Sequence, residues 1–153
     1  MSFLDVVIAP STLAARLLNP LQAVFALGAR LTVSMPFLKA GYFKATRWDS
    51  TLLRFASEYP VPWLSPHDAA VAGTFGEVFL PALLVIGLYG RLSALGLFIV
   101  NAMATVAFSR KLLAHGAEAA LGQHILWGTL LLAVIVYGPG KWSLDHFMNR
   151  ARA

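Results

Sequence analysis

The chain has 153 residues, of which 58% are hydrophobic and 12% are charged, and its mean hydropathy is +0.69. A typical soluble domain is about 45–50% apolar and about 25% charged, so the composition excludes an ordinary soluble protein and predicts one membrane domain over residues 1–153. The lack of cysteine excludes disulfides, thiolate metal ligands and a cysteine nucleophile. The net charge is +5, but the basic residues are scattered and form no block of like charges. This distribution argues against nucleic acid as a partner and favours contact with the lipid bilayer.

The N-terminal stretch MSFLDVVIAPSTLAARLLNP lacks a basic segment, and Pro10 breaks its short apolar run. We therefore expect it to be retained rather than removed as a signal peptide. Ser11 is a good helix N-cap, which predicts a short amphipathic helix from Ser11 to Leu18 at the membrane interface. Pro20 is then expected to open the first membrane span.

Four stretches are long and apolar enough to cross a bilayer, whose hydrocarbon core requires about 20 residues of helix. They cover residues 20–42, 68–89, 91–109 and 119–138. The sequence therefore predicts an all-α transmembrane four-helix bundle with up-down topology. Gly90 and Arg91 predict a tight turn between the second and third spans, and the GPG motif at 138–140 is expected to end the fourth.

The connection FKATRWDSTLLRFASEYPVPWLSPH at 43–67 is the long loop of the predicted bundle. Apolar residues recur in it at helical spacing, namely Leu52, Leu53, Phe55 and Ala56. We predict a short interfacial helix there, ended by Pro60 and Pro62. This helix either caps a pocket within the membrane or simply packs onto the bundle.

The basic residues do not decide the orientation of the bundle. Leaving out Arg30, the side that holds both termini has five, Arg16, Arg91, Lys141, Arg150 and Arg152. The opposite side has six, Lys39, Lys44, Arg47, Arg54, Arg110 and Lys111. A difference of one residue is too small for the positive-inside rule to assign the cytoplasmic side.

Each predicted span contributes a polar residue. From a rise of 1.5 Å per residue, Arg30, Glu77 and Asn101 lie about 14–15 Å into their spans, near the middle of a core about 30 Å thick. The other polar residues of this set are Thr105, Gln123 and His124. A charge in hydrocarbon costs several kcal/mol unless it is paired, which predicts an Arg30–Glu77 ion pair oriented by Asn101. Such a layer either marks a functional site or fixes the register of the helices.

His124 has Trp127 and Gly128 one turn further along the same helix. These neighbours place His124 at a candidate pocket, where it could bind a quinone carbonyl or relay a proton, or it could pack as a structural residue. Glu77 is the second candidate for proton transfer. Together with Arg30, Asn101, Thr105, Gln123 and Trp127, these residues form the candidate ligand-binding or polar-core set.

The sequence gives little support for a metal site or for hydrolase or nucleotide chemistry. Met35 and Met103 with His124 would be soft ligands for Cu(I), but methionines at helical spacing are more often core residues, so we predict no metal site. The sequence also contains no HExxH motif, glycine-rich phosphate loop or serine-elbow motif, which argues against hydrolase and nucleotide chemistry.

Three motifs resemble the DoxX family of small four-helix membrane proteins. They are ARLTVSMPFLKAGYFK at 29–44, with Arg30, Phe37, Gly41 and Lys44 at pattern positions; Glu77 followed by GLYGRLSAL at 87–95; and YGPGKWSLD at 137–145. The resemblance extends over nearly the whole chain after residue 20. It implies a bundle in the bacterial inner membrane with both termini in the cytoplasm, and it places Arg30 and Glu77 on pattern positions.

The resemblance also implies possible roles. Some family members are membrane subunits of quinone-linked sulfur oxidation or redox-stress complexes. The loop WDSTLLRFASEYPVPWLSP at 48–66 resembles a branch of the family that is often encoded beside metal-handling or peptide-modifying genes. Both features imply a protein partner.

Two hypotheses follow. In the first, the chain binds a quinone or a similar lipophilic molecule without a covalent bond and serves a redox complex, in which the partner or the quinone carries the electrons. In the second, it is a non-catalytic scaffold or assembly factor for a neighbouring metal-handling or oxidoreductase system. Small residues would permit close helix contacts, including those of a homo-oligomer, at Gly73, Gly76, Gly87, Ser93 and Gly96. A transporter is disfavoured because four short spans show no inverted repeat.

Overall fold

The computed structural model describes residues 3–58, 61, 63–108, 113 and 118–152, with side chains from residue 13 onward. The regular elements in these ranges are all helices. They are α1 (Phe3–Thr46), α2 (Trp48–Ser57), α3 (Pro66–Ile86), α4 (Gly90–Ala107), α6 (Glu118–Tyr137) and α7 (Leu144–Arg152). The helices α1, α3, α4 and α6 are long and apolar enough to cross a membrane. The predicted all-α fold with four membrane-spanning helices is confirmed.

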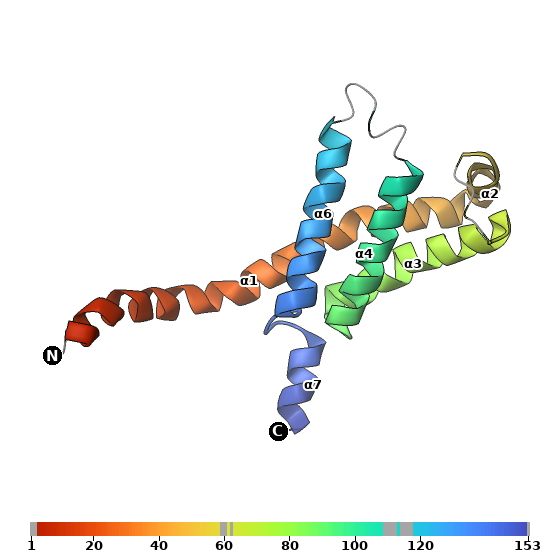
Figure 1. The fold of residues 1–153 in the computed structure, drawn as a ribbon. Helices are drawn as coiled ribbons and strands as arrows, with labels where there is room; N and C mark the ends of the chain where they lie inside the picture. Colours follow the sequence, from red (N-terminus) through yellow and green to blue (C-terminus); the bar gives the residue numbers. More distant parts are fainter. Residues whose placement is uncertain (1–2, 59–60, 62, 109–112, 114–117, 153) are drawn as a thin grey trace.

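The four long helices form two antiparallel pairs. Figure 1 shows α1 beside α3 and α4 beside α6, with the second pair crossing the first in this view. Contacts of α3 with α4 and of α1 with α6 join the pairs into one bundle. All four helices contribute to its apolar core, which consists of Val33, Phe37, Leu84, Ala94, Leu97, Leu131 and Val134.

The bundle has an apolar surface and buried polar side chains, as expected for a protein surrounded by hydrocarbon. Large apolar side chains are exposed along the helices, for example Phe75, Phe79, Leu92, Ile99, Ile125, Leu132 and Val136. Polar and charged side chains are buried instead, among them Arg30, Ser34, Glu77, Ser93 and Asn101. Because polar groups inside a bilayer are stable only where they face the interior of a bundle, the chain is a multi-pass membrane protein.

Helix α1 differs from the prediction. It is continuous from Phe3 to Thr46, and its N-terminal part extends beyond the other helices in Figure 1. The separate interfacial helix predicted at Ser11–Leu18 and the helix start predicted at Pro20 are therefore wrong. A proline removes one backbone hydrogen bond, but ending the helix in apolar surroundings would leave several backbone groups unpaired. The helix therefore continues through Pro20.

The short helix predicted after the first span is present as α2. Thr51 and Phe55, one helical turn apart, are buried, whereas Leu53 and Ala56 are exposed. Phe55 packs with Ala69 and Ala70 in a second apolar cluster, so α2 lies against α3. The predicted stop signals Pro60 and Pro62 lie outside the described residues.

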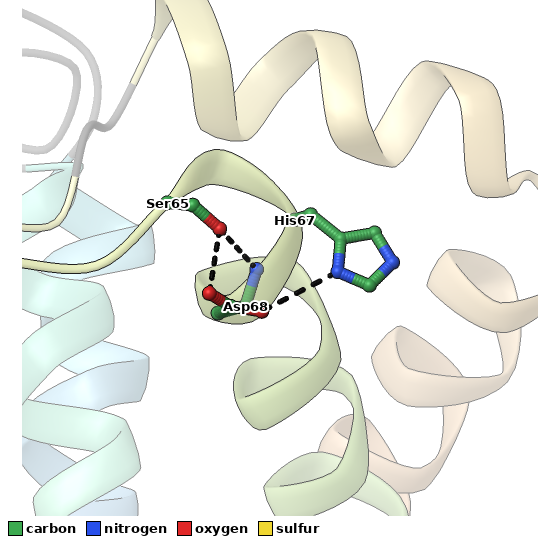
Figure 2. Close-up of polar contacts among 3 residues, drawn as sticks. All are labelled: Ser65, His67 and Asp68. Atoms are coloured by element: carbon green, nitrogen blue, oxygen red, sulfur yellow. Dashed lines mark hydrogen bonds and ion pairs between the residues drawn. The ribbon is translucent and has the colours of Figure 1, made fainter.

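Helix α3 begins with Ser65 as its N-cap, shown in Figure 2. The Ser65 hydroxyl oxygen accepts a hydrogen bond from the Asp68 backbone N–H at 3.1 Å and donates to the Asp68 carboxylate at 2.7 Å. His67 Nδ1 lies 3.5 Å from the other Asp68 oxygen. Because the hydroxyl points to the carboxylate and the backbone rather than to the imidazole, this Ser–His–Asp group is a helix cap and not a hydrolytic triad. Pro66 follows at the first helical position, where its missing N–H costs nothing.

Arg30 caps the other end of α3. Its Nη1 donates to the carbonyl oxygens of Leu84 at 3.3 Å and Val85 at 3.1 Å, and its Nη2 donates to the carbonyl of Trp142. The side chain is fully buried. The last carbonyls of a helix lack intrahelical partners and carry partial negative charge, so a buried guanidinium satisfies them and is itself stabilised.

The segment after α6 completes this arrangement. The predicted stop at GPG is confirmed, because α6 ends at Tyr137 and Gly138 has a φ of 88°. The Asp145 carboxylate accepts hydrogen bonds from the backbone N–H groups of Tyr89 at 2.8 Å and Gly90 at 2.7 Å, at the start of α4. The turn predicted at Gly90 and Arg91 therefore lies slightly earlier in the chain, since both residues already belong to α4.

At Gly87 the backbone lies in close contact with Arg30 and with Ser143. Its φ of 71° is one that residues with a Cβ rarely adopt, and a Cβ there would collide with Arg30 Nη1 and with Ser143. The motifs around Arg30, Gly87 and Asp145 thus meet at one end of the bundle. We refer to Arg30, Gly87, Trp142 and Asp145 as the Arg30 cluster.

The Arg30 cluster yields a stability prediction. Arg30→Lys keeps the charge but loses the forked donors, so at least one of the three carbonyls loses its hydrogen bond. A hydrogen bond to a charged group contributes about 1.5–3 kcal/mol, and we expect a loss of this size in the free energy of unfolding, measured by denaturant unfolding in detergent. Arg91→Lys is the control, because Arg91 is exposed. Equal stability of the two variants would contradict the capping role.

The N-cap at Ser65 yields a second prediction. Ser65→Ala removes the acceptor of the Asp68 N–H, and the loss of an N-cap costs about 1 kcal/mol. Hydrogen exchange of the Asp68 amide is expected to become about fivefold faster. Ser57→Ala is the matched control, since the Ser57 hydroxyl only bonds a carbonyl of its own helix. An unchanged exchange rate in Ser65→Ala would show that water replaces the cap at no cost.

Candidate functional site

Glu77 on α3 forms an ion pair with Lys44 on α1, in which Lys44 Nζ donates to Glu77 Oε1. Glu77 is only 6% exposed. The predicted Arg30–Glu77 pair is therefore wrong. Arg30 lies beside Leu84 and Val85, which follow Glu77 by seven and eight residues, or about 11 Å along α3. The predicted depth of Arg30 was counted from Pro20, where no helix begins.

Gly41 allows Lys44 to reach Glu77. A Cβ on Gly41 would lie 2.6 Å from a methyl carbon of Val78 and 3.1 Å from the backbone carbonyl carbon of Glu77. Glycine therefore lets the backbones of α1 and α3 approach closely at this level. Lys44 lies one helical turn after Gly41, on the same face of α1.

Asn101 and His124 form a second polar pair, between α4 and α6. Asn101 Nδ2 donates to the His124 backbone carbonyl at 3.0 Å, and Asn101 Oδ1 lies 2.8 Å from His124 Nδ1. Because the carbonyl can only accept, the amide orientation is fixed, and His124 Nδ1 must carry the proton that Oδ1 accepts. In the neutral ring, Nε2 is then an acceptor. Asn101 therefore sets the tautomer of His124 and does not orient an Arg30–Glu77 pair.

Two cavities meet at the Lys44–Glu77 pair. The first, of about 330 Å³, is lined by His124, Trp127, Phe37 and the α2 residues Ser50, Thr51 and Arg54, among others. The second, of about 300 Å³, has mostly apolar walls that include Phe55, Leu64, Ala69, Val100 and Met103. Both cavities are lined by Lys44, Glu77, Ala104 and Phe108. Helix α2 therefore supplies part of the wall of the first cavity.

Of the remaining residues of the predicted ligand-binding or polar-core set, some line these cavities and others lie elsewhere in the bundle. Trp127 lines the first cavity, with its ring centroid 5.0 Å from that of His124 and 5.6 Å from that of Phe37. The Thr105 hydroxyl bonds the Asn101 carbonyl of its own helix at 2.9 Å, and Gln123 is exposed. The structure thus brings Glu77, His124 and Trp127 to one cavity wall, while Arg30 and Gln123 lie elsewhere.

Lys44 is the principal residue of the site that the prediction missed. From the sequence, Lys44 was counted among the basic residues on one side of the bundle, although it occupies a family pattern position. The signal available in the sequence was its spacing of three residues from Gly41, which places both on the helix face that approaches α3. Arg54, Ser50 and Thr51 were also missed, because their contribution depends on how α2 packs.

Two further observations describe the chemistry of the site. The second carboxylate oxygen of Glu77, Oε2, is buried without a hydrogen-bond partner among the described residues. In the same part of the chain, no group of three His, Asp or Glu side chains lies close enough to hold a metal ion. The site therefore offers hydrogen-bonding and ionic groups within largely apolar walls.

Comparison with known proteins gives one family. A family model described as DoxX matches residues 25–110. This segment includes Arg30, Lys44, Glu77 and Asn101, and it ends before His124 and the motif at 137–145. No curated protein and no solved structure matches the chain. Because the family model covers more than half of the sequence and the structure has four membrane-spanning helices, the chain belongs to the DoxX family.

Proposed function

We propose that this protein binds a lipophilic small molecule of the quinone class beside the Lys44–Glu77 pair and serves as a membrane subunit of a redox complex. The observation that carries the proposal is a buried carboxylate in the wall shared by two cavities, with one oxygen unpaired among the described residues. A buried polar atom without a partner is costly, so a ligand that pairs with it gains affinity. The complex would reside in the inner membrane with both termini in the cytoplasm.

The shape and lining of the cavities support a small lipophilic ligand. Binding sites for small molecules are commonly about 300–1,000 Å³ in volume, mainly apolar, and contain a few polar groups that fix orientation. The first cavity has Lys44, Glu77 and His124 for hydrogen bonding and the rings of Phe37, Phe43 and Trp127 for stacking. The second cavity supplies an apolar space for a hydrocarbon tail.

The residues present fit the headgroup of a quinone and of its reduced form, the quinol. Lys44 has N–H groups for a carbonyl oxygen, and Glu77 and His124 have acceptor atoms for a hydroxyl. A quinone, when bound, supplies two-electron chemistry that this cysteine-free chain lacks. The chain would hold the ring away from water, and a partner protein would exchange electrons with it.

A second candidate function is a membrane scaffold or assembly factor. It is favoured by the N-terminal part of α1, which extends beyond the other helices in Figure 1. Large apolar side chains are exposed along the first half of α1, namely Leu13, Leu17, Leu18, Leu21 and Phe25, of which the last three line the groove that α1 forms with α6. Such a face could pack against a helix of a partner or of a second copy within the membrane.

A cavity-filling variant tests the proposal. Ala104 lines both cavities, so Ala104→Leu is expected to lower the amount of co-purified quinone at least severalfold by occupying space at their shared wall. The measurement is mass-spectrometric quantification of extracted quinone per mole of protein purified in mild detergent. Ala133→Leu is the matched control, because Ala133 lines a different groove, between α1 and α6.

Two outcomes would contradict the quinone proposal. Wild-type protein that carries only bulk lipid, even when supplied with quinone, would favour the scaffold. Equal loss of quinone in Ala104→Leu and Ala133→Leu would place the ligand outside the proposed cavities. Thermal unfolding of each variant establishes that the comparison is made on folded protein.

A further inference from the structure

The cavity wall presents two hydrogen-bond acceptors from different helices. The first is His124 Nε2, because Asn101 Oδ1 takes the proton on Nδ1 at 2.8 Å and leaves Nε2 as the acceptor of the neutral ring. The orientation of Asn101 is held in turn by its 3.0 Å hydrogen bond to the His124 carbonyl. His124 lines the first cavity, and its Nε2 makes no hydrogen bond to the described part of the chain.

The second acceptor is Glu77 Oε2. Lys44 satisfies Oε1, whereas Oε2 is buried and has no partner among the residues that the structure describes. A buried carboxylate oxygen requires a donor, since leaving it unmatched costs more than a single hydrogen bond contributes. Glu77 lines both cavities, so a ligand in either would lie beside its side chain.

The charged and hydroxyl donors in the same walls, in contrast, already have hydrogen-bond partners or are exposed. Lys44 is partly exposed and already paired, and Arg54 is exposed, so both can also hydrogen-bond water. The Thr51 hydroxyl already donates to backbone carbonyls, since its oxygen lies 3.1 Å from the carbonyl oxygens of both Lys44 and Arg47. The buried atom of these walls that has no partner among the described residues is therefore an acceptor, Glu77 Oε2. A carbonyl oxygen placed beside it would meet an oxygen with no proton between them.

Building on the function proposed above, we infer that the site selects a lipophilic ligand that presents hydroxyl donors, namely the quinol form or a related phenol, over the corresponding quinone. A quinol hydroxyl donates to Glu77 Oε2 or to His124 Nε2, and the hydrocarbon tail lies in the apolar second cavity. A quinone has only acceptors for these positions. The discrimination resembles that of other sites in which a buried polar group rejects a ligand that lacks its hydrogen-bonding partner.

The test compares the two redox forms of one ligand. A decyl-substituted benzoquinol and the matching benzoquinone are titrated anaerobically into protein held in phosphatidylcholine nanodiscs, with empty nanodiscs correcting for partition into lipid. We expect the quinol to bind about tenfold or more tightly than the quinone, the effect of one hydrogen bond to a charged group. Glu77→Gln and His124→Phe should each reduce this ratio, whereas the exposed-site controls Glu118→Gln and His146→Phe should keep it.

The other outcomes would overturn the selectivity, the proposed site or the assignment of the two acceptors. Equal affinities, or tighter binding of the quinone to wild type, would overturn the selectivity and leave the proposed quinone site intact. Saturable binding of neither form would overturn both proposals. A quinol preference that persists in Glu77→Gln and in His124→Phe would overturn the assignment of the two acceptors. The wild-type comparison decides the selectivity even if one variant fails to fold.

Discussion

A charge inside a bilayer must find its partners within the protein, and this constraint determines where the polar groups of the bundle lie. Arg30 meets it with the carbonyls at the end of α3 and the carbonyl of Trp142. Glu77 meets it with Lys44, about two helical turns earlier along α3. The two clusters use the same helix, but the second also borders two cavities.

The Arg30 cluster links three helix ends and leaves little space. Its carbonyls and carboxylate are hydrogen-bonded, Gly87 has no room for a side chain, and Arg30 Nε is the buried atom of the cluster that has no partner among the described residues. The Lys44–Glu77 pair also has one unpaired buried atom among the described residues, a carboxylate oxygen, but this pair borders two cavities. We attribute the architecture of the bundle to the first cluster and ligand binding to the second.

The sequence was sufficient to predict the parts of the fold that depend on hydropathy and local signals. The four apolar stretches predicted the long helices, and GPG predicted the end of α6. The pairing of Glu77 could not be predicted, because depth along a helix requires its starting point, and α1 passes through Pro20 without interruption. The helix α7 was not predicted either, since nine largely polar residues produce no hydropathy signal.

The candidate site shows the same division. His124, Trp127 and Glu77 were found because polar or aromatic residues in apolar helices are conspicuous. The tautomer of His124 depends on the orientation of the Asn101 amide, and the role of Lys44 depends on the close approach of α1 and α3 at Gly41. Both are properties of packing between helices, so composition and spacing alone do not specify them.

The position of the bound ligand tests the division between the two clusters most directly. A photoreactive quinol analogue would be cross-linked to the protein in nanodiscs, and the labelled peptides would be identified by mass spectrometry. We expect labels on residues of the two cavities, such as Phe43, Ala104, His124 and Trp127. Labels confined to the groove between α1 and α6, at Leu21, Phe25 or Tyr137, would contradict it.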